Sequence, residues 1–158
     1  MIAHHFGELF QNEPESLQAA GMLAPRVWEF SQFLLEVAHV DDVGARLDDV
    51  VTYHDSCHAL REFGIQDGPR RLLAHVRGLE LREMGTAAEC CGFGGTFSIK
   101  FPEVSGGMAR TKIDSILRTG AKTVVSVDSS CLMQIQGALS RAALPVRTMH
   151  LAEVLASR

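Results

Sequence analysis

The sequence contains no long hydrophobic run and no strongly basic segment. No apolar stretch approaches the ~20 residues that a membrane-spanning helix needs, so we expect no transmembrane segment. The net charge is −4 and no cluster of lysine and arginine stands out, which is unlike a nucleic-acid-binding protein. The N-terminal stretch MIAHHFGELF lacks a basic region followed by an apolar core. We therefore expect no secretory signal and a cytoplasmic location.

Cysteine is also scarce, and the positions of the four cysteines are the most informative feature of the chain. Cys57 stands alone, Cys90 and Cys91 are adjacent and precede Gly92, and Cys131 comes last. Thiols stay reduced in the cytosol, where grouped cysteines more often bind metals or act in catalysis than form disulfides. Adjacent cysteines rarely pair with each other but can present two thiolates to one metal centre. The pattern therefore predicts a cysteine-bound metal or iron–sulfur site.

Short apolar strands alternate with helices from residue 50 onward. The expected strands are 50–53, 79–84, 123–127 and 146–149, and the expected helices are 57–63, 69–77, 104–119, 130–142 and 150–157. Strands that alternate with helices at this spacing are typical of βαβ units. We therefore predict an α/β fold, a Rossmann-like parallel sheet flanked by helices.

The first 48 residues have a different character. Apolar residues recur at helical spacing over 25–39, where we expect a helix in which Trp28 packs. Residues 40–48 are acidic and are expected to be a linker. We therefore assign an N-terminal helical segment and linker to residues 1–48 and a cysteine-bearing domain to residues 49–158.

Each cysteine position follows a predicted strand. Cys57 comes shortly after the first strand, Cys90 and Cys91 lie in the loop after the second, and Cys131 follows the third. Parallel strands all end at the same edge of a sheet, and ligands bind at that edge. The four sulfurs are therefore expected to converge at the C-terminal edge of the strands.

The local sequence around these cysteines suits thiolates. Cys57 and Cys131 fall in or near the first turn of a helix, where free N–H groups and the helix dipole lower a thiol pKa. The loop after Cys91 contains Gly92, Gly94 and Gly95, and at these positions no side chain covers the backbone. Backbone N–H groups can then approach a sulfide or thiolate closely, as an anionic cluster requires.

Several other polar residues near the cysteines have both a structural and a functional interpretation. His58 can complete a Cys3His zinc site or donate a hydrogen bond to a cluster, whereas His54 ends a strand and is expected to be structural. Arg61 and Lys100 can pair with an anionic cluster or a carboxylate substrate, or they are solvated surface charges. The residues expected to cap helices are Asp55, Asp128, Ser129 and Ser130.

Three segments closely resemble the cysteine-rich (CCG) domain family. They are HDSCHALREFGI at 54–65, ECCGFGGTFSIKFPEVSGGMARTKIDSI at 89–116 and VVSVDSSCLMQIQGAL at 124–139. The resemblance covers roughly residues 50–155 and is strongest to the lactate-utilization and glycolate oxidase iron–sulfur subunits. It implies that Cys57, Cys90, Cys91 and Cys131 bind a 4Fe–4S cluster. His58, which adjoins Cys57, is the reserve metal ligand that the sequence offers.

Two features depart from the pattern of that group. Its members carry two such modules in tandem, whereas this chain resembles only the second, and residues 1–12 resemble the end of a first module. We therefore expect the chain to be a C-terminal fragment of a two-module protein, a split gene product or a chain with a misassigned start. The family motif also ends in a further cysteine, and Met133 stands in that slot as an expected core residue. Four thiolates suffice for a 4Fe–4S cluster, and three with a histidine suffice for zinc.

Three functions remain open at this stage. The resemblance implies a non-catalytic redox subunit that accepts electrons from a partner oxidising L-lactate, glycolate or a related 2-hydroxy acid. No Gly-x-Gly-x-x-Gly follows a strand, so a flavin or nicotinamide would belong to another subunit of the complex, as would further iron–sulfur centres. The alternative is a zinc-bearing structural or docking module. A remote alternative is a thiol enzyme with Cys57 as nucleophile and His58 or His54 as base.

Overall fold

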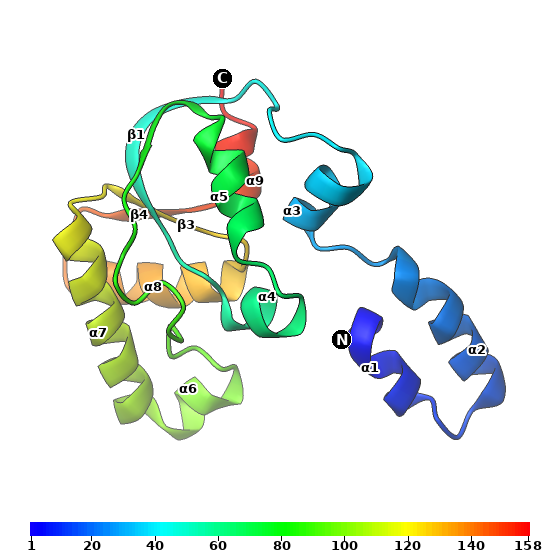
Figure 1. The fold of residues 1–158 in the computed structure, drawn as a ribbon. Coiled ribbons are helices and arrows are strands. Elements are labelled where there is room, and N and C mark those ends of the chain that lie inside the picture. Colours follow the sequence, from blue (N-terminus) through cyan, green and yellow to red (C-terminus); the bar gives the residue numbers. More distant parts are fainter.

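A sheet of four parallel strands forms the centre of the computed structural model, which describes residues 1–158 (Figure 1). The strands are β1 (Arg46–Tyr53), β2 (Arg77–Leu81), β3 (Thr123–Ser126) and β4 (Arg147–His150). Their order across the sheet is β2-β1-β3-β4, and every neighbouring pair is parallel. This arrangement confirms the predicted α/β fold with a parallel sheet flanked by helices.

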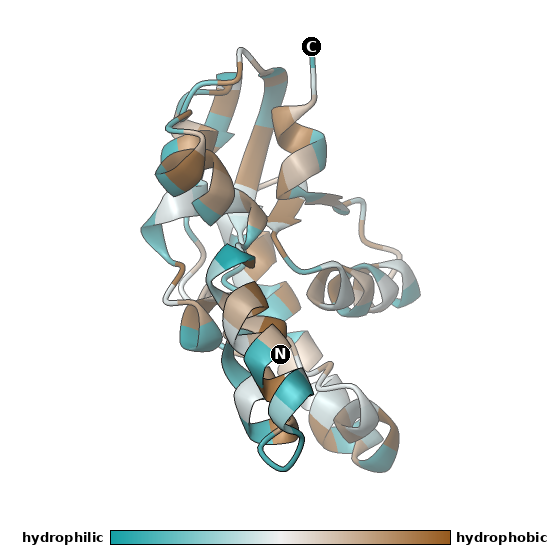
Figure 2. Cartoon of the chain, turned by 90° about the vertical axis from the view of Figure 1, so that its right-hand side faces the viewer, coloured by the Kyte–Doolittle hydropathy of each residue, from teal (hydrophilic) through white to brown (hydrophobic).

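Helices cover both faces of the sheet. On one face, α5 (Asp67–Ala74) and α9 (Leu151–Leu155) pack against Val51, Tyr53 and Val125. On the other face, α7 (Pro102–Thr119) and α8 (Ser129–Arg141) pack against Val124. Neighbouring residues of a strand point to opposite faces, so Val124 and Val125 belong to different halves of the core. Figure 2 shows hydrophobic residues, in brown, in the strands and in the helices that surround them.

Some element boundaries differ from those expected. Strand β1 begins at Arg46, inside the expected linker, because Arg46 pairs with Arg77 of β2 in the sheet. Strand β2 ends at Leu81 rather than Met84, and the buried Met84 packs into the core beside α7. Helix α6 (Thr96–Lys100) lies where only a loop was expected, because five residues are too few to show a helical period.

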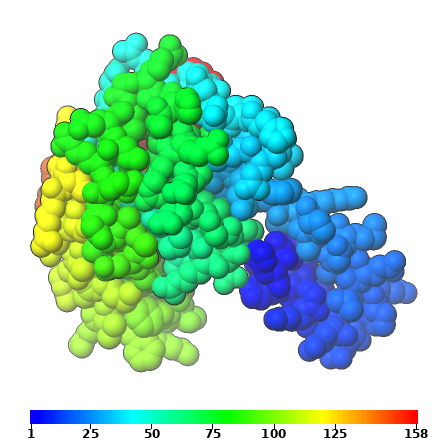
Figure 3. All heavy atoms as spheres, viewed as in Figure 1, coloured from blue at the N-terminus to red at the C-terminus, as the bar shows by residue number.

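The N-terminal residues form an arm of short helices that projects from the sheet-containing body (Figures 1 and 3). Its elements are α1 (Ile2–Leu9), α2 (Pro14–Leu23), the 3₁₀ helix η1 (Ala24–Arg26), α3 (Phe30–Gln32) and the π-helical turn η2 (Phe33–Val37). The expected continuous helix over 25–39 is therefore wrong, since Glu29 starts a new helix by accepting hydrogen bonds from Ser31 and Gln32. Trp28, expected to be packed, is 43% exposed.

The tip of the arm contacts α4 (Cys57–Glu62) and the residue that follows it. The His5 Nε2 atom lies 3.1 Å from a carboxylate oxygen of Glu62, and the ring of His4 stacks edge-on against Phe63. These contacts hold the arm beside the helix that Cys57 begins. None of the helices of the protein is both long and apolar enough to cross a membrane.

Near the N-terminal ends of β3 and β4, the side chain of Asp49 connects three strands, β1, β3 and β4. Its carboxylate accepts hydrogen bonds from the Thr123 hydroxyl at 2.6 Å and the Arg147 guanidinium at 2.9 Å. Burial alone would raise the pKa of Asp49, but the hydrogen bonds from Thr123 and Arg147 outweigh it and lower this pKa. The stabilisation is therefore present above the unfolded-state pKa of 3.8 and is lost as the pH falls through the folded-state pKa.

Replacing Asp49 by asparagine is expected to lower the free energy of unfolding by about 1 kcal/mol at pH 7. The difference from the parent chain should shrink below about pH 4, because both chains then carry a neutral side chain at this position. Urea denaturation of the two metal-free proteins at both pH values measures this. Asp48→Asn is the matched control, since Asp48 pairs with Arg46 at the exposed surface and should change little. An equal loss at both pH values would contradict the assignment.

Candidate metal centre

The four cysteines come from three loops at the C-terminal edge of the sheet. Cys57 is the first residue of α4, directly after β1. Cys90 and Cys91 lie in the loop between β2 and α6, and Cys131 lies in the first turn of α8 after β3. All four are free thiols, and each interacts electrostatically with at least one of the others. The structure therefore places the four cysteines at one edge of the sheet, and only Cys91 and Cys131 belong, with His54, to the group close enough to hold one metal ion.

Cys91 and Cys131 form the buried half of this group, together with His54. The two sulfurs and one ring nitrogen of His54 all lie within 4.8 Å of one another. His54 is completely buried, and neither of its ring nitrogens has a hydrogen-bond partner. A buried imidazole without partners is costly, and a bound metal ion would satisfy it.

Cys57 and Cys90 form the half-buried side of the group, and their thiols interact with each other. The backbone N–H of Gly92 donates a hydrogen bond to the sulfur of Cys90 at 3.4 Å. Gly92 has a φ of 88°, and a Cβ at this position would lie 2.7 Å from the carbonyl oxygen of Ser105. Only glycine therefore lets the cysteine loop approach α7 this closely.

The thiol pKa values do not follow the helix-terminus expectation. The pKa of Cys57 is raised, by burial first and then by the neighbouring thiols of Cys90 and Cys91. In the buried pair, a hydrogen bond between Cys131 and Cys91 lowers the pKa of Cys91 and raises that of Cys131. At Cys57, burial together with the neighbouring thiols thus outweighs the positive end of the helix, because both disfavour the thiolate.

A buried lysine that the sequence analysis did not single out lies beside the thiols. Lys112, on α7, is 1% exposed and its ammonium group donates a hydrogen bond to the carbonyl oxygen of Thr86. Burial lowers the pKa of Lys112, and the nearby Glu89 and Cys91 oppose that change. The sequence pattern could have identified Lys112, because it lies on the same face of α7 as Ala109 and Ile113. A lysine on a buried helix face needs a charged or polar partner.

The capping predictions at the strand ends are partly right. Asp128 caps α8, accepting hydrogen bonds from the backbone N–H groups of Ser130 and Cys131, whereas Ser129 and Ser130 lie in the first turn and are not caps. The expected cap at Asp55 is wrong. Ser56 caps α4 instead, and the carboxylate of Asp55 is bound by the Arg70 guanidinium at 2.8 and 3.0 Å.

The remaining candidate residues lie outside the buried group of Cys91, Cys131 and His54, although the charge of Arg61 opposes the raised pKa of Cys57. His58 is exposed and its ring stacks edge-on against Phe63, so the histidine beside the buried thiols is His54. Arg61 and Lys100 are exposed and make no ion pair. Met133, expected in the core, is 60% exposed because α8 turns that face toward α7 and solvent.

The donor atoms present fit a metal centre. Thiolate and imidazole are the ligands preferred by zinc and, for thiolates, by iron–sulfur clusters. Two buried sulfurs beside an imidazole without partners form a group close enough to bind a metal, and two more sulfurs adjoin it. The set of donors by itself is compatible with either kind of centre.

Comparison with known proteins agrees with this site. The description of the family whose profile matches residues 51–136 is "Cysteine-rich domain", and the matched range includes all four cysteines. Over 155 residues, 98% of the chain, the sequence is 41% identical to a Bacillus cereus protein named lactate utilization protein A. It is 43% identical to the protein of the same name from Exiguobacterium sp. and 41% identical to lactate utilization protein A 2 of Bacillus mycoides. The chain spans 63% to 65% of the length of these relatives.

Proposed function

The chain belongs to the cysteine-rich (CCG) domain family, and from this premise we propose that it is an iron–sulfur electron-transfer subunit, or a part of one. The system it serves would oxidise L-lactate, glycolate or a related 2-hydroxy acid. The names of its relatives support the lactate part of this proposal, because they state lactate utilization. The observation that carries the proposal is the position of four free thiols at one sheet edge, two of which, Cys91 and Cys131, lie within 4.8 Å of each other and of His54. A 4Fe–4S cluster held by Cys57, Cys90, Cys91 and Cys131 would supply one-electron transfer there.

The surroundings of the thiols support an anionic centre. The Gly92 N–H points at the sulfur of Cys90, as N–H groups do around iron–sulfur clusters. The buried ammonium of Lys112 lies close enough to Cys91 and Cys131 to be influenced by their charges. A buried ammonium group and backbone N–H donors both stabilise negative charge, most strongly on the buried side of the site. The role of Lys112 in this proposal is to neutralise part of the charge of four thiolates.

A redox centre of this kind requires partners. We propose that a flavin or iron–sulfur subunit of the same complex donates the electrons, since no dinucleotide-binding loop follows a strand here. Because the relatives are longer than this chain, a first cysteine-rich module is a second proposed partner. The expected location is the cytoplasm.

A zinc-bearing docking module is the second candidate, and His54 is the observation that favours it. Cys91, Cys131 and His54 already lie within 4.8 Å of one another, and one further thiolate would complete a tetrahedral Cys3His site. The thiol-enzyme hypothesis has the least support. The pKa of Cys57 is raised rather than lowered, and His58 is stacked against Phe63.

The metal content of protein purified without oxygen tests the proposal. We expect about four iron and four sulfide per chain, with broad visible absorption. About one zinc per chain without sulfide would overturn the electron-transfer role and support the docking module. A chain that binds neither under reconstitution with iron and sulfide or with zinc would refute both proposals.

A further inference from the structure

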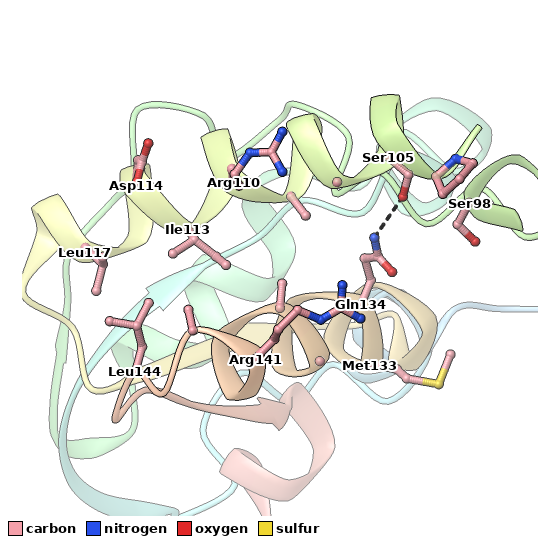
Figure 4. A pocket seen from close by; sticks show the side chains of 16 residues that line it. Ser98, Ser105, Arg110, Ile113, Asp114, Leu117, Met133, Gln134, Arg141 and Leu144 are labelled. Carbon is pink, nitrogen blue, oxygen red and sulfur yellow. Dashed lines mark hydrogen bonds between the residues drawn. The ribbon is translucent and has the colours of Figure 1, made fainter.

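A groove of about 740 Å³ lies between α7 and α8, on the outer side of the helices that cover the cysteine-bearing half of the core (Figure 4). Its size falls within the roughly 300–1,000 Å³ that is usual for small-molecule sites. None of the four cysteines lines it. The groove is therefore a separate feature from the candidate metal centre.

The two ends of the groove differ in chemistry. Figure 4 shows Ile113, Leu117 and Leu144 toward one end, where they form an apolar wall. Ser105 and Gln134 lie toward the other end, and the Gln134 amide donates a hydrogen bond to the Ser105 hydroxyl at 3.1 Å. A molecule that fills the groove would therefore need one apolar part and one polar part.

Arg141 gives the groove a positive charge. Arg141, on the α8 wall, extends along α8 toward Gln134 in Figure 4, whereas the guanidinium of Arg110 lies along α7 beside Gly106 and Gly107. Neither guanidinium makes an ion pair or a hydrogen bond. Asp114 is the single acidic residue of the lining, and its carboxylate is directed away from Arg141 in Figure 4. The polar part of a matching ligand would therefore be an anion.

Glycines keep the groove open where side chains would fill it. Gly106 in α7 and Gly137 in α8 both line the groove. A Cβ added at Gly137 would meet no atom within 4 Å, and one added at Gly106 would meet only the Arg110 guanidinium at 3.5 Å. Glycine weakens a helix interior relative to alanine, and the surrounding packing does not require it at these positions. The open space is thus maintained against the preference of both helices.

We propose that this groove binds an organic anion, with a carboxylate or phosphate held by Arg141 beside Gln134 and an apolar body along Ile113 and Leu144. Arginine suits this role because its planar fork donates two parallel hydrogen bonds to either anion. This inference goes beyond the proposed electron-transfer function and does not depend on which metal the cysteines hold.

The groove also adjoins the cysteine loop through hydrogen bonds. The Ser105 hydroxyl, which accepts from Gln134, donates to the carbonyl oxygen of Gly92 at 2.7 Å. Gly92 directly follows Cys91. An anion that hydrogen-bonds to Gln134 would therefore be linked, through the Gln134–Ser105 and Ser105–Gly92 hydrogen bonds, to the loop that carries the cysteines.

Calorimetric titration of the full chain with matched probes tests the proposal. Octanoate and octyl phosphate carry the anion and the apolar body, octanol lacks the charge, and acetate and inorganic phosphate lack the apolar body. We expect one or both of the first two to bind at least about tenfold more tightly than the other three, because a charge-assisted hydrogen bond is worth about that factor. The stronger of the two identifies the anion as carboxylate or phosphate. Equal binding of octanol, or binding of none of the probes, overturns the proposal.

Two variants locate the binding in the groove. Arg141→Gln is expected to weaken binding of the better probe about tenfold, whereas Arg118→Gln, an exposed arginine of α7 outside the lining, should leave it unchanged. Gly137→Leu should fold, because space is open around Gly137, and should abolish binding by filling the groove. Unchanged binding in both Arg141→Gln and Gly137→Leu overturns the proposal. Metal content of the variants is measured in parallel and should equal that of the parent, so failure here is distinct from failure of the metal proposal.

Discussion

Replacing Cys91 by serine is expected to abolish metal binding. Cys91 is buried, lies beside both Cys131 and His54, and has the thiol with the lowered pKa, so it is positioned to be a thiolate ligand. A serine hydroxyl keeps the size of the side chain but is a poor ligand for zinc or for an iron–sulfur cluster at neutral pH. We expect metal content to fall from one centre per chain to near zero, measured together with the visible spectrum.

The control for this variant is Met133→Leu, which removes a sulfur atom from α8 only two residues after Cys131. Met133 is 60% exposed, and the substitution should leave metal content unchanged. His54→Ala separates the two candidate centres, since it should remove a zinc ligand but leave four thiolates for a cluster. Retention of full metal content by Cys91→Ser would show that the metal is held elsewhere.

The cysteine positions could be predicted because parallel-sheet geometry is simple. Cys57 and Cys131 follow strands that are rich in β-branched residues, and the ends of such strands meet at one edge whatever the details of packing. The position of His54 could have been inferred by strand alternation. Side chains alternate between the two faces of a strand. Tyr53 packs against α5 and α9, so Thr52 and His54 are expected to point to the opposite face of the sheet. His58 lies on the exposed side of α4. A helix of six residues is too short for the sequence pattern to show which of its sides is exposed.

Other features depended on partners that are remote in the sequence. Asp55 resembles a cap in the sequence, but Arg70 binds its carboxylate across the loop from α5, and no local pattern encodes that choice. Lys112 could be noticed on a buried helix face, but its partner Thr86 lies 26 residues away. The N-terminal arm has many exposed apolar residues and few long-range contacts, so periodicity alone placed its helix boundaries poorly.

Replacing Arg70 by methionine is expected to lower the free energy of unfolding by about 3 kcal/mol. The Arg70 guanidinium binds the carboxylate of Asp55, which is 2% exposed, and also that of Glu83, and it lies 5.0 Å above the ring of Tyr53. Methionine retains much of the side-chain volume but leaves the carboxylate of Asp55 buried without its cation. Urea denaturation of the metal-free chain measures the loss. Arg71→Met is the matched control, because Arg71 is largely exposed and its nearest carboxylate oxygen, from Asp41, is 3.9 Å away.

The double variant Arg70→Met with Asp55→Asn decides what the loss means. If an uncompensated buried charge causes the instability, neutralising Asp55 should restore at least about half of the lost free energy, since an amide can be buried at lower cost than a carboxylate. If the double variant is no more stable than Arg70→Met alone, the contribution of Arg70 comes from packing on Tyr53 and from Glu83 instead. Asp55 directly follows His54, so the same ion pair fixes the end of β1 at which the candidate metal ligand lies. Restored stability with reduced metal affinity would therefore show that the pair positions His54 as well as stabilising the fold.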